Sequence, residues 1–179
     1  MRIISGKYKG KRLTAPKKLP VRPTTDMAKE ALFNILENHY SFSEISVFDL
    51  FSGTGNIAYE FISRGAQQIT VVDANFHCIR FISKTLKDWE ENIDVIKSDA
   101  FKFLSKTQKT ADIIFADPPY NLPIADFEKI INLVFGKNLL NPDGILILEH
   151  STRTTFSDLS VFTEKRKYGN STFSFFKKN

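Results

Sequence analysis

From residue 45 onward, short apolar runs alternate with longer segments in which apolar residues recur every three or four positions. The short runs predict buried strands, and the periodic segments predict amphipathic helices. Regular alternation of the two is typical of a parallel sheet covered by helices on both faces. The predicted strands are 46–51, 69–73, 93–97, 112–116 and 144–149, and the predicted helices are 57–64, 75–91, 99–106 and 124–136.

The pattern differs on either side of this alternating region. An amphipathic helix is predicted from Asp26 to about residue 39. At the other end, strands are predicted at 159–167 and 171–177, joined by the turn sequence Tyr168-Gly169-Asn170, which favours an antiparallel hairpin. We therefore expect an α/β fold with a doubly wound, mostly parallel sheet that finishes in an antiparallel hairpin.

The first residues of the chain form a separate region. Residues 2–14 contain two short runs punctuated by Gly6 and Gly10, which predicts a small β-hairpin. Residues 15–23 contain three prolines and predict an extended connector. We therefore divide the chain into a basic N-terminal hairpin and connector, residues 1–23, and a main domain, residues 24–179.

Positive charge is concentrated in this N-terminal region. The net charge of the chain is +5, yet residues 1–25 hold eight basic side chains and no acid. The other 154 residues hold 17 basic and 20 acidic side chains, a net charge of −3. A basic arm on a mildly acidic body predicts a polyanionic partner. The alternative is a charged surface that is merely solvated.

Composition excludes several classes of protein. With 179 residues and 42% hydrophobic content, the chain can form one domain with a substantial core. Its single cysteine, Cys78, excludes a disulfide framework and is expected to lie buried on a helix. No apolar run could span a membrane and no signal peptide or exposed apolar stripe is evident, so we expect a soluble cytoplasmic monomer. His39, His77 and His150 are scattered, so we expect no metal site and histidines that are structural or exposed.

A glycine-containing loop follows the first predicted strand. Within the segment 49–58, Gly53 and Gly55 allow a ligand to approach the backbone closely at the start of a helix. Asp73 ends the second strand, 20 positions after Gly53, where a carboxylate can accept hydrogen bonds from ribose hydroxyls. Asp99 follows the third strand. The pattern predicts a nucleoside-containing cofactor, and the alternative is a tight turn with acids that cap helices.

Asp49 helps to choose between two such cofactors. Its carboxylate lies at a strand tip, four residues before Gly53, where it would repel a pyrophosphate and attract an ammonium group. S-adenosylmethionine has an ammonium group and no phosphate, whereas a nicotinamide dinucleotide has a pyrophosphate. The residue therefore favours S-adenosylmethionine, although its side chain could instead cap the amides of its own loop.

The most informative segment is Asp117-Pro118-Pro119-Tyr120, which follows the apolar run 112–116. The prolines cannot continue a sheet ladder, so carbonyl groups are left without strand partners beyond the strand end. Open α/β sheets bind ligands at that edge. A carboxylate, a carbonyl and an aromatic ring within four residues suit a planar group that carries an NH2. The alternative is a strand-ending turn with a surface tyrosine.

In their order and spacing, these motifs resemble class I S-adenosylmethionine-dependent methyltransferases that modify exocyclic amines of nucleobases. The residues that carry this resemblance are Asp49 to Ala58, Asp73, Asp99 and Asp117 to Tyr120. The start of the chain looks like the RsmD family of bacterial 16S ribosomal RNA guanine-N2 methyltransferases. The stretches that match this family are Met1 to Leu13, Arg22 to Asp26, Lys29 to Asn34 and Arg166 to Gly169.

The resemblance implies a seven-stranded Rossmann-like sheet whose final hairpin contains the reversed strand, and 16S ribosomal RNA of the small subunit or its assembly intermediate as partner. It implies that S-adenosylmethionine is bound by Thr24, Thr25, Asp49, Phe51, Gly53, Gly55, Asp73, Asp99 and Ala100. It implies that the target base is held by the catalytic residues Asp117, Pro118, Pro119 and Tyr120. The residues implied in RNA binding are Arg2, Lys7, Tyr8, Lys9, Lys11, Arg12 and Arg22.

Three other functions stay open at the level of sequence. An adenine-N6 methyltransferase on DNA or RNA would use the same strand-end motif, because that motif suits any exocyclic amine. An RNA-binding assembly factor without catalysis would keep the fold, but the intact Asp117 and the Gly53-x-Gly55 loop argue against it. A nucleotide-dependent oxidoreductase is disfavoured by Asp49 and by the Pro118-Pro119 strand end.

Overall fold

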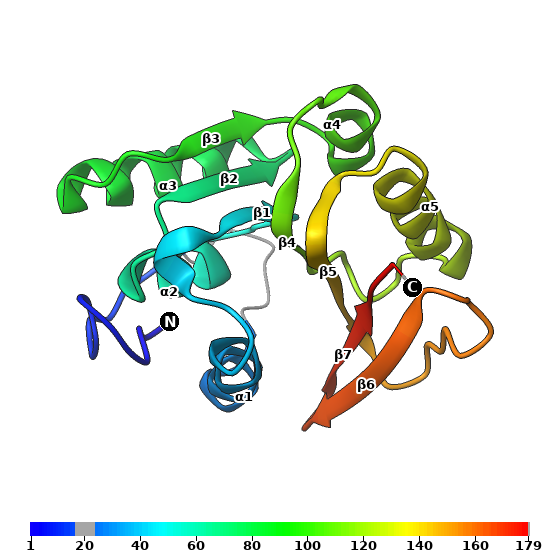
Figure 1. Ribbon diagram of the computed structural model, residues 1–179. Coiled ribbons are helices and arrows are strands. Elements are labelled where there is room, and N and C mark those ends of the chain that lie inside the picture. Colours follow the sequence, from blue (N-terminus) through cyan, green and yellow to red (C-terminus); the bar gives the residue numbers. More distant parts are fainter. Residues whose placement is uncertain (17–23, 179) are drawn as a thin grey trace.

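Seven strands form one sheet in the computed structural model, which describes residues 1–16 and 24–178 (Figure 1). The order across the sheet is β3-β2-β1-β4-β5-β7-β6. The strands are β1 (Ser46–Leu50), β2 (Gln68–Asp73), β3 (Asp94–Lys97), β4 (Ala111–Ala116), β5 (Leu140–Ser151), β6 (Phe162–Tyr168) and β7 (Ser171–Phe176). The helices within these residues are α1 (Asp26–Glu37), α2 (Asn56–Ser63), α3 (Phe76–Trp89), α4 (Ala100–Lys106) and α5 (Ile124–Gly136), with a short 3-10 helix at Phe42–Glu44.

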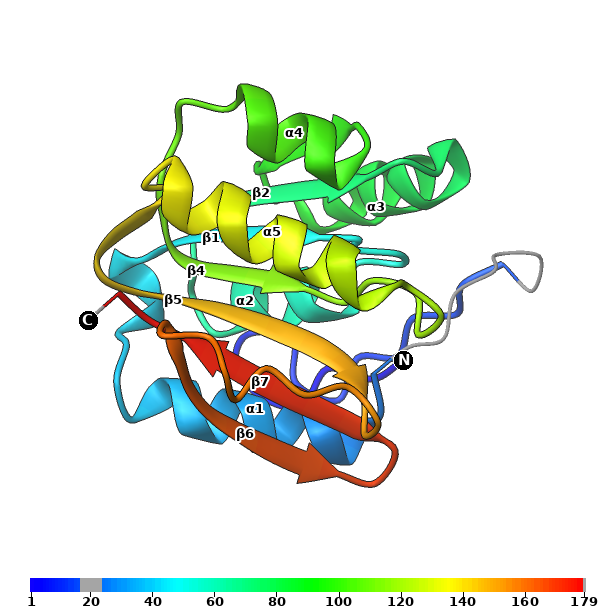
Figure 2. The ribbon, with the colours of Figure 1, turned by 90° about the vertical axis from the view of Figure 1, so that its right-hand side faces the viewer.

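Strand direction agrees with the sequence prediction. The strands β1 to β5 pair in parallel, whereas β7 runs antiparallel to both β5 and β6. The arrowheads of β2, β4 and β5 in Figure 2 therefore point one way and that of β7 points the other way. The predicted mostly parallel sheet with a reversed strand in its last hairpin is confirmed.

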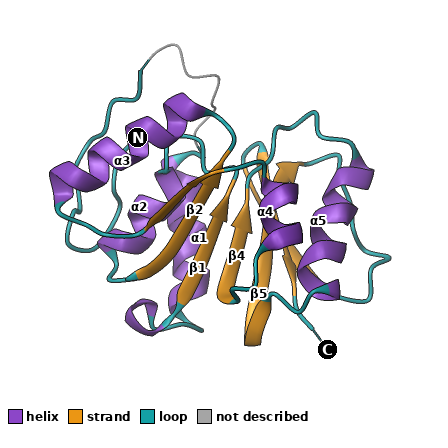
Figure 3. Cartoon of the chain, turned by 90° about the horizontal axis from the view of Figure 1, so that it is seen from above, coloured by secondary structure: helices purple, strands orange, loops and turns teal. Residues whose placement is uncertain are grey.

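Both faces of the sheet are covered, which explains why its strands are apolar at consecutive positions. The helices α1, α2 and α3 pack on one face, and α4 and α5 pack on the other (Figure 3). Neighbouring strand residues consequently belong to different cores. Ile113 packs toward α1 to α3, and the next residue, Ile114, packs toward α4 and α5. The predicted doubly wound arrangement is thus present.

Most element boundaries lie within about two residues of the prediction. The main exception is β5, which begins at Leu140 rather than at residue 144. Leu140 pairs with Ala111, and the register then shifts before Ile145 pairs with Ile113. This irregularity accommodates Pro142 inside the strand, because a bulge tolerates a residue that cannot donate to the ladder.

The predicted N-terminal hairpin is present only as a tightly turned segment, which we call the arm (residues 1–14). Its two sides meet in a single antiparallel bridge between Arg2 and Arg12, and no regular strand forms there. The reason is that the amides of Ile4 and Ser5 donate to the Glu60 carboxylate, at 2.9 and 3.0 Å, instead of to an opposing strand. The arm is therefore held both by α2 and by its own hairpin hydrogen bonds, from the amide of Ile3 to the carbonyl of Lys11 and from the amide of Leu13 to the carbonyl of Met1, each 3.0 Å long.

The arm packs closely on α2, whose residues are all buried. Ile3 of the arm is 1% exposed and belongs to the core formed with α1 and α2. A Cβ atom on Gly6, whose φ is +81°, would lie 1.8 Å from the carbonyl oxygen of Ser63. Glycine is therefore required where the arm crosses the end of α2.

A buried charged cluster joins the arm to α1 and α2. The Lys29 ammonium group donates to the carbonyl of Arg2 at 2.7 Å and to Asn56 Oδ1 at 2.9 Å, and lies 3.4 Å from Glu60. Glu60 also accepts from Arg64 Nε at 2.9 Å. Each buried charge is thus paired and hydrogen-bonded, which offsets the cost of removing it from water.

Two of the sequence predictions fall partly outside the described part of the chain. Residues 17–23 of the predicted connector, including Arg22, lie there, so the division at residue 23 stays a prediction. Within the described residues, none of the helices combines the length and apolar character needed to cross a membrane.

Candidate active site

A cavity of about 460 Å³ lies at the carboxyl ends of β1, β2 and β4. Its volume is in the range of small-molecule and cofactor sites, and its position is where open parallel sheets bind ligands. The predicted site residues that line it are Thr24, Asp49, Phe51, Gly53, Asp73, Asp99, Ala100, Asp117, Pro118, Pro119 and Tyr120. The sequence motifs therefore converge on one cavity.

Two of the predicted cofactor residues do not line this cavity. Gly55 begins α2 with a φ of +81°, and a Cβ atom there would lie 2.9 Å from the ring of Tyr59 and 3.1 Å from Ile82. Its absent side chain thus permits close packing of the helices rather than ligand contact. Thr25 is the N-cap of α1, and its hydroxyl accepts from the amide of Ala28 at 3.2 Å.

Asp73 organises the glycine-containing loop. Its Oδ2 accepts from the amide of Gly53 at 2.8 Å, and its Oδ1 accepts from the amide of Asn75 at 2.7 Å. Phe51 and Gly53 reach the turn with positive φ values of 56° and 54°. Since each carboxylate oxygen has two lone pairs, Asp73 can hold the loop and still accept hydrogen bonds from a ligand in the cavity.

Asp49 is buried beneath this loop, with 1% of its surface exposed. Burial raises the pKa of its carboxyl group to about 8; the negative charge of Asp73 also raises it, and a hydrogen bond from the amide of Ala58 opposes the rise. The alternative role, capping of amides in its own segment, is present in the bond from Ala58, and Asp49 also lines the cavity, while its pairing with an ammonium group stays a prediction. A cationic group at this position would stabilise the ionised carboxylate.

Asp99 marks the opposite part of the cavity, at the start of α4. Its Oδ1 accepts from the amide of Lys102 at 2.9 Å, so the expected alternative of a capping acid holds for this residue. Asp99 and the buried Ala100 nevertheless both line the cavity. Capping fixes the orientation of the residue and leaves further lone pairs toward a ligand.

The strand-end motif is anchored at both of its ends. The amide of Asp117 donates to the carbonyl of Leu50 at 3.3 Å, which ties the end of β4 to the end of β1. The hydroxyl of Tyr120 donates to Glu149 at 3.3 Å and lies 3.1 Å from the Ser171 hydroxyl. Burial raises the pKa of Tyr120. The alternative of a surface tyrosine is wrong, because this ring is half-buried and its hydroxyl is fixed.

Sequence reasoning missed Glu149, the buried acid that links these parts. Its Oε2 accepts from the hydroxyl of Thr24 at 2.7 Å, while its Oε1 accepts from Tyr120. Glu149 therefore connects the segment preceding α1 to the strand-end motif. The sequence did contain a signal for Glu149, because this residue stands at the end of an apolar run, as Asp49, Asp73 and Asp117 do.

Tyr8 of the arm has a different environment from the one expected. Its ring stacks on Trp89 with a centroid distance of 4.1 Å, and its hydroxyl donates to Glu91 at 2.6 Å. Lys7 and Lys11 lie over the same ring, at 4.9 and 5.2 Å from its centroid. Tyr8 therefore anchors the arm on α3 and does not present an open stacking surface to RNA.

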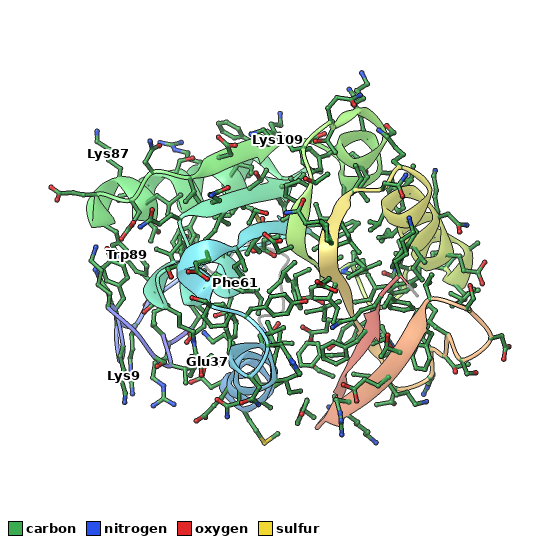
Figure 4. The ribbon with its side chains drawn as sticks, in the orientation of Figure 1. Lys9, Glu37, Phe61, Lys87, Trp89 and Lys109 are labelled. Atoms are coloured by element: carbon green, nitrogen blue, oxygen red, sulfur yellow. The ribbon has the colours of Figure 1, made fainter. Side chains whose placement is uncertain are left out.

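The basic side chains of the arm point outward. Arg2, Lys7, Lys9, Lys11 and Arg12 are all exposed. Figure 4 shows Lys9 projecting from the same side of the molecule as Trp89. Some of these cations have partners, since Arg2 pairs with Asp26 at 3.1 Å and Lys7 pairs with Glu91 at 2.9 Å. The arm thus presents a positive surface that is held in place by contacts with α1, α2 and the residue Glu91 after α3.

The histidines and the cysteine follow the prediction. His39 and His77 are exposed, and His150 is buried with Nε2 2.7 Å from the hydroxyl of Ser174. Cys78 is fully buried on α3. No group of three or more His, Cys, Asp or Glu within residues 1–16 and 24–178 could hold a metal ion.

Comparison with known proteins gives consistent matches along the chain. A family model described as "Conserved hypothetical protein 95" matches residues 1–177. The "Putative rRNA methyltransferase YlbH" of Bacillus subtilis is 33% identical over 187 residues, covering 99% of this chain and 99% of that protein. The "Ribosomal RNA small subunit methyltransferase D" of Buchnera aphidicola is 33% identical over 150 residues, covering 83% of this chain and 75% of that protein.

A solved structure with a closely similar fold carries a related description. It is titled "Putative methyltransferase yhhF from Escherichia coli" and superposes with a TM-score of 0.82 at 26% identity. The match covers 98% of this chain and 96% of that one. The similarity thus includes both the arm and the sheet.

Proposed function

Because the chain belongs to the RsmD family of methyltransferases, we propose that it transfers a methyl group from S-adenosylmethionine to the exocyclic N2 amine of a guanine in 16S ribosomal RNA. The proposed substrate is the small ribosomal subunit or its assembly intermediate, and we expect the enzyme to act as a cytoplasmic monomer.

The observation that carries this proposal is the charge of the cavity. Its lining includes Asp73, Asp99 and Asp117, together with Asp49, whose raised pKa of about 8 leaves it to ionise beside a cation, and it includes no Lys, Arg or His among the described residues. Such a site favours a cationic ligand and repels phosphate groups. It therefore suits S-adenosylmethionine and disfavours a dinucleotide, which argues against the oxidoreductase alternative.

The donor set fits S-adenosylmethionine part by part. Asp49 would pair with its ammonium group, and Thr24 borders the same cavity. Asp73 would accept hydrogen bonds from the ribose hydroxyls. Asp99 and Ala100, at the start of α4, would contact the adenine. When bound, S-adenosylmethionine supplies a methyl group on a positively charged sulfur.

The strand-end motif would prepare the amine for reaction. Its lone pair is delocalised into the guanine ring, so it is a poor nucleophile until it is oriented. The Asp117 carboxylate and the Pro118 carbonyl would accept hydrogen bonds from the two N–H groups of the amine. These bonds would direct its lone pair toward the methyl group. Asp117 would then take the released proton. Tyr120, whose hydroxyl is fixed by Glu149 and Ser171, would stack on the base.

Methyl transfer to small subunits that lack this modification tests the proposal. We expect label from S-adenosylmethionine to appear in N2-methylguanosine after digestion of the 16S RNA. Label in N6-methyladenosine would reject the proposed base and support the adenine-N6 alternative. Cofactor binding without any transfer to subunits, naked RNA or DNA would instead support an inactive assembly factor.

The arm is proposed to bind the phosphate backbone of the RNA. Replacing exposed Lys9 and Arg12 by Gln should weaken subunit binding and flatten its salt dependence. Each lost phosphate contact should reduce the slope of log affinity against log salt by about 0.7 to 0.9. Filter binding at several salt concentrations measures this slope. Lys109→Gln, which removes an exposed cation paired with Asp94, is the matched control. An unchanged slope in the double variant would show that the arm does not contact the RNA backbone.

A further inference from the structure

A second cavity adjoins the candidate base site. It has a volume of about 210 Å³ and lies between the start of α1 and the turn that joins β6 to β7. Figure 2 shows α1 running beside this hairpin. The volume is below that of typical sites for drug-sized ligands, so the cavity suits a smaller group.

Tyr120 lines both cavities, so the two cavities are neighbours. Its position is fixed, because its hydroxyl contacts Glu149 and Ser171, and Ser171 itself lines the second cavity. A planar group on one side of this ring would be a direct neighbour of a planar group on the other side. Two adjacent nucleotides of one RNA strand have this relationship.

The lining of the second cavity combines apolar and aromatic surface with polar groups at its edge. Met27 is 60% exposed, and it lies against the turn, 3.8 Å from where a Cβ atom of Gly169 would be. Tyr168 is half-buried and packs on Phe173. Asn170 adds an amide at the rim. Unpaired bases are recognised in RNA by this combination of stacking and edge hydrogen bonds.

The charge beside the cavity favours an RNA strand over an uncharged ligand. Lys165 and Lys167 are exposed on β6 just before Tyr168, and Arg166 between them is paired with Glu164 at 2.6 Å. On the α1 side, the carboxylate of Asp26, which precedes Met27, is already paired with Arg2. Cations therefore flank an apolar cavity, as expected where a base is buried and its phosphate stays at the surface.

We propose that this cavity, formed by Met27, Tyr168 and the β6–β7 turn, binds an unpaired nucleotide directly adjacent to the methylated one. The inference rests on the proposed function and extends it, because it assigns the recognition of RNA sequence next to the target to a second subsite. Tyr120 then separates the two bases and keeps the target base aligned with Asp117.

Kinetics with matched variants test the subsite. Met27→Ala and Tyr168→Leu should raise KM for small subunits by about 5- to 150-fold, the range expected for loss of one base contact, with kcat and cofactor affinity retained. Phe76→Ala is the control, since Phe76 is also an exposed apolar residue at a helix start but lines neither cavity. Met27 is exposed, so its truncation should leave the melting temperature unchanged. An unchanged KM in both variants would overturn the subsite.

Crosslinking gives a second, independent measurement. With Met27 replaced by the photoreactive residue p-benzoylphenylalanine, we expect a crosslink to the nucleotide immediately beside the methylated guanosine, mapped by primer extension. The same replacement at Phe76 should not crosslink there. A crosslink from residue 27 to distant RNA or to ribosomal protein would reject the proposal even if the enzyme is active. Absence of methyl transfer by the wild-type protein would instead overturn the proposed function itself.

Discussion

Asp117→Ala is expected to lower kcat for methyl transfer by about 10²- to 10⁴-fold while S-adenosylmethionine still binds. The reason is that the proposed role of this carboxylate concerns the amine of the base, as hydrogen-bond acceptor and as the group that takes the proton. The fold should persist, because the contact that ties this position to β1 is made by the backbone amide of Asp117 and not by its side chain. Single-turnover transfer and calorimetric cofactor binding measure the two effects separately.

Two further variants sharpen this test. Asp117→Asn keeps an acceptor oxygen but loses the charge, so its rate should fall between those of wild type and Asp117→Ala. Glu128→Gln removes an exposed acid on the nearby helix α5 that does not line the cavity, and it should leave the rate unchanged. Wild-type turnover by Asp117→Ala would exclude this residue from the reaction.

Much of the fold was predictable, because the strands are short apolar runs in a sheet covered on both faces. The same reasoning located the cavity, since parallel strands end at a common edge and Asp49, Asp73 and Asp117 each stand at a strand end. Their positions at strand ends were thus enough to predict that these carboxylates lie close together. The start of β5 at Leu140 was missed, because the segment before Gly144 holds Pro142 and has no continuous apolar run, whereas the structure absorbs the proline in a bulge.

The remaining features depend on contacts between distant segments. Tyr8 and Trp89 are separated by 81 positions, and only their packing shows that this tyrosine anchors the arm. Glu60 accepts hydrogen bonds from the amides of Ile4 and Ser5, so the predicted hairpin is bound to a helix in addition to its own bridge between Arg2 and Arg12. Local patterns describe which residues can form strands and turns, but they do not state which partner satisfies a backbone amide.

Asp49→Asn is expected to stabilise the protein at pH 8 relative to wild type. The pKa of Asp49 is about 8 in the folded protein, whereas an unfolded chain gives an aspartate pKa of about 3.9. Between these pH values the unfolded state binds fewer protons, so the free energy of unfolding of the wild type falls as pH rises. Asparagine does not ionise, so the variant does not lose stability in this way as pH rises. Its melting temperature should exceed that of wild type increasingly from pH 5 to pH 8, by about 2 to 4 °C per kcal/mol.

The same substitution should weaken binding of S-adenosylmethionine, because an amide keeps an acceptor oxygen but has no negative charge to pair with the ammonium group. In the wild type at pH 7, Asp49 is mostly protonated before binding and becomes ionised beside the cation, so binding should release close to one proton. Calorimetry in buffers of different ionisation enthalpy counts this proton. Asp99→Asn is the matched control, since it alters another carboxylate of the cavity and should retain the release. Wild-type binding without proton release would show that Asp49 does not meet the ammonium group. In that case the burial of an acid that weakens the fold near neutral pH would need another explanation. Release of the proton would instead identify cation binding as the reason why an acid is buried at this strand end.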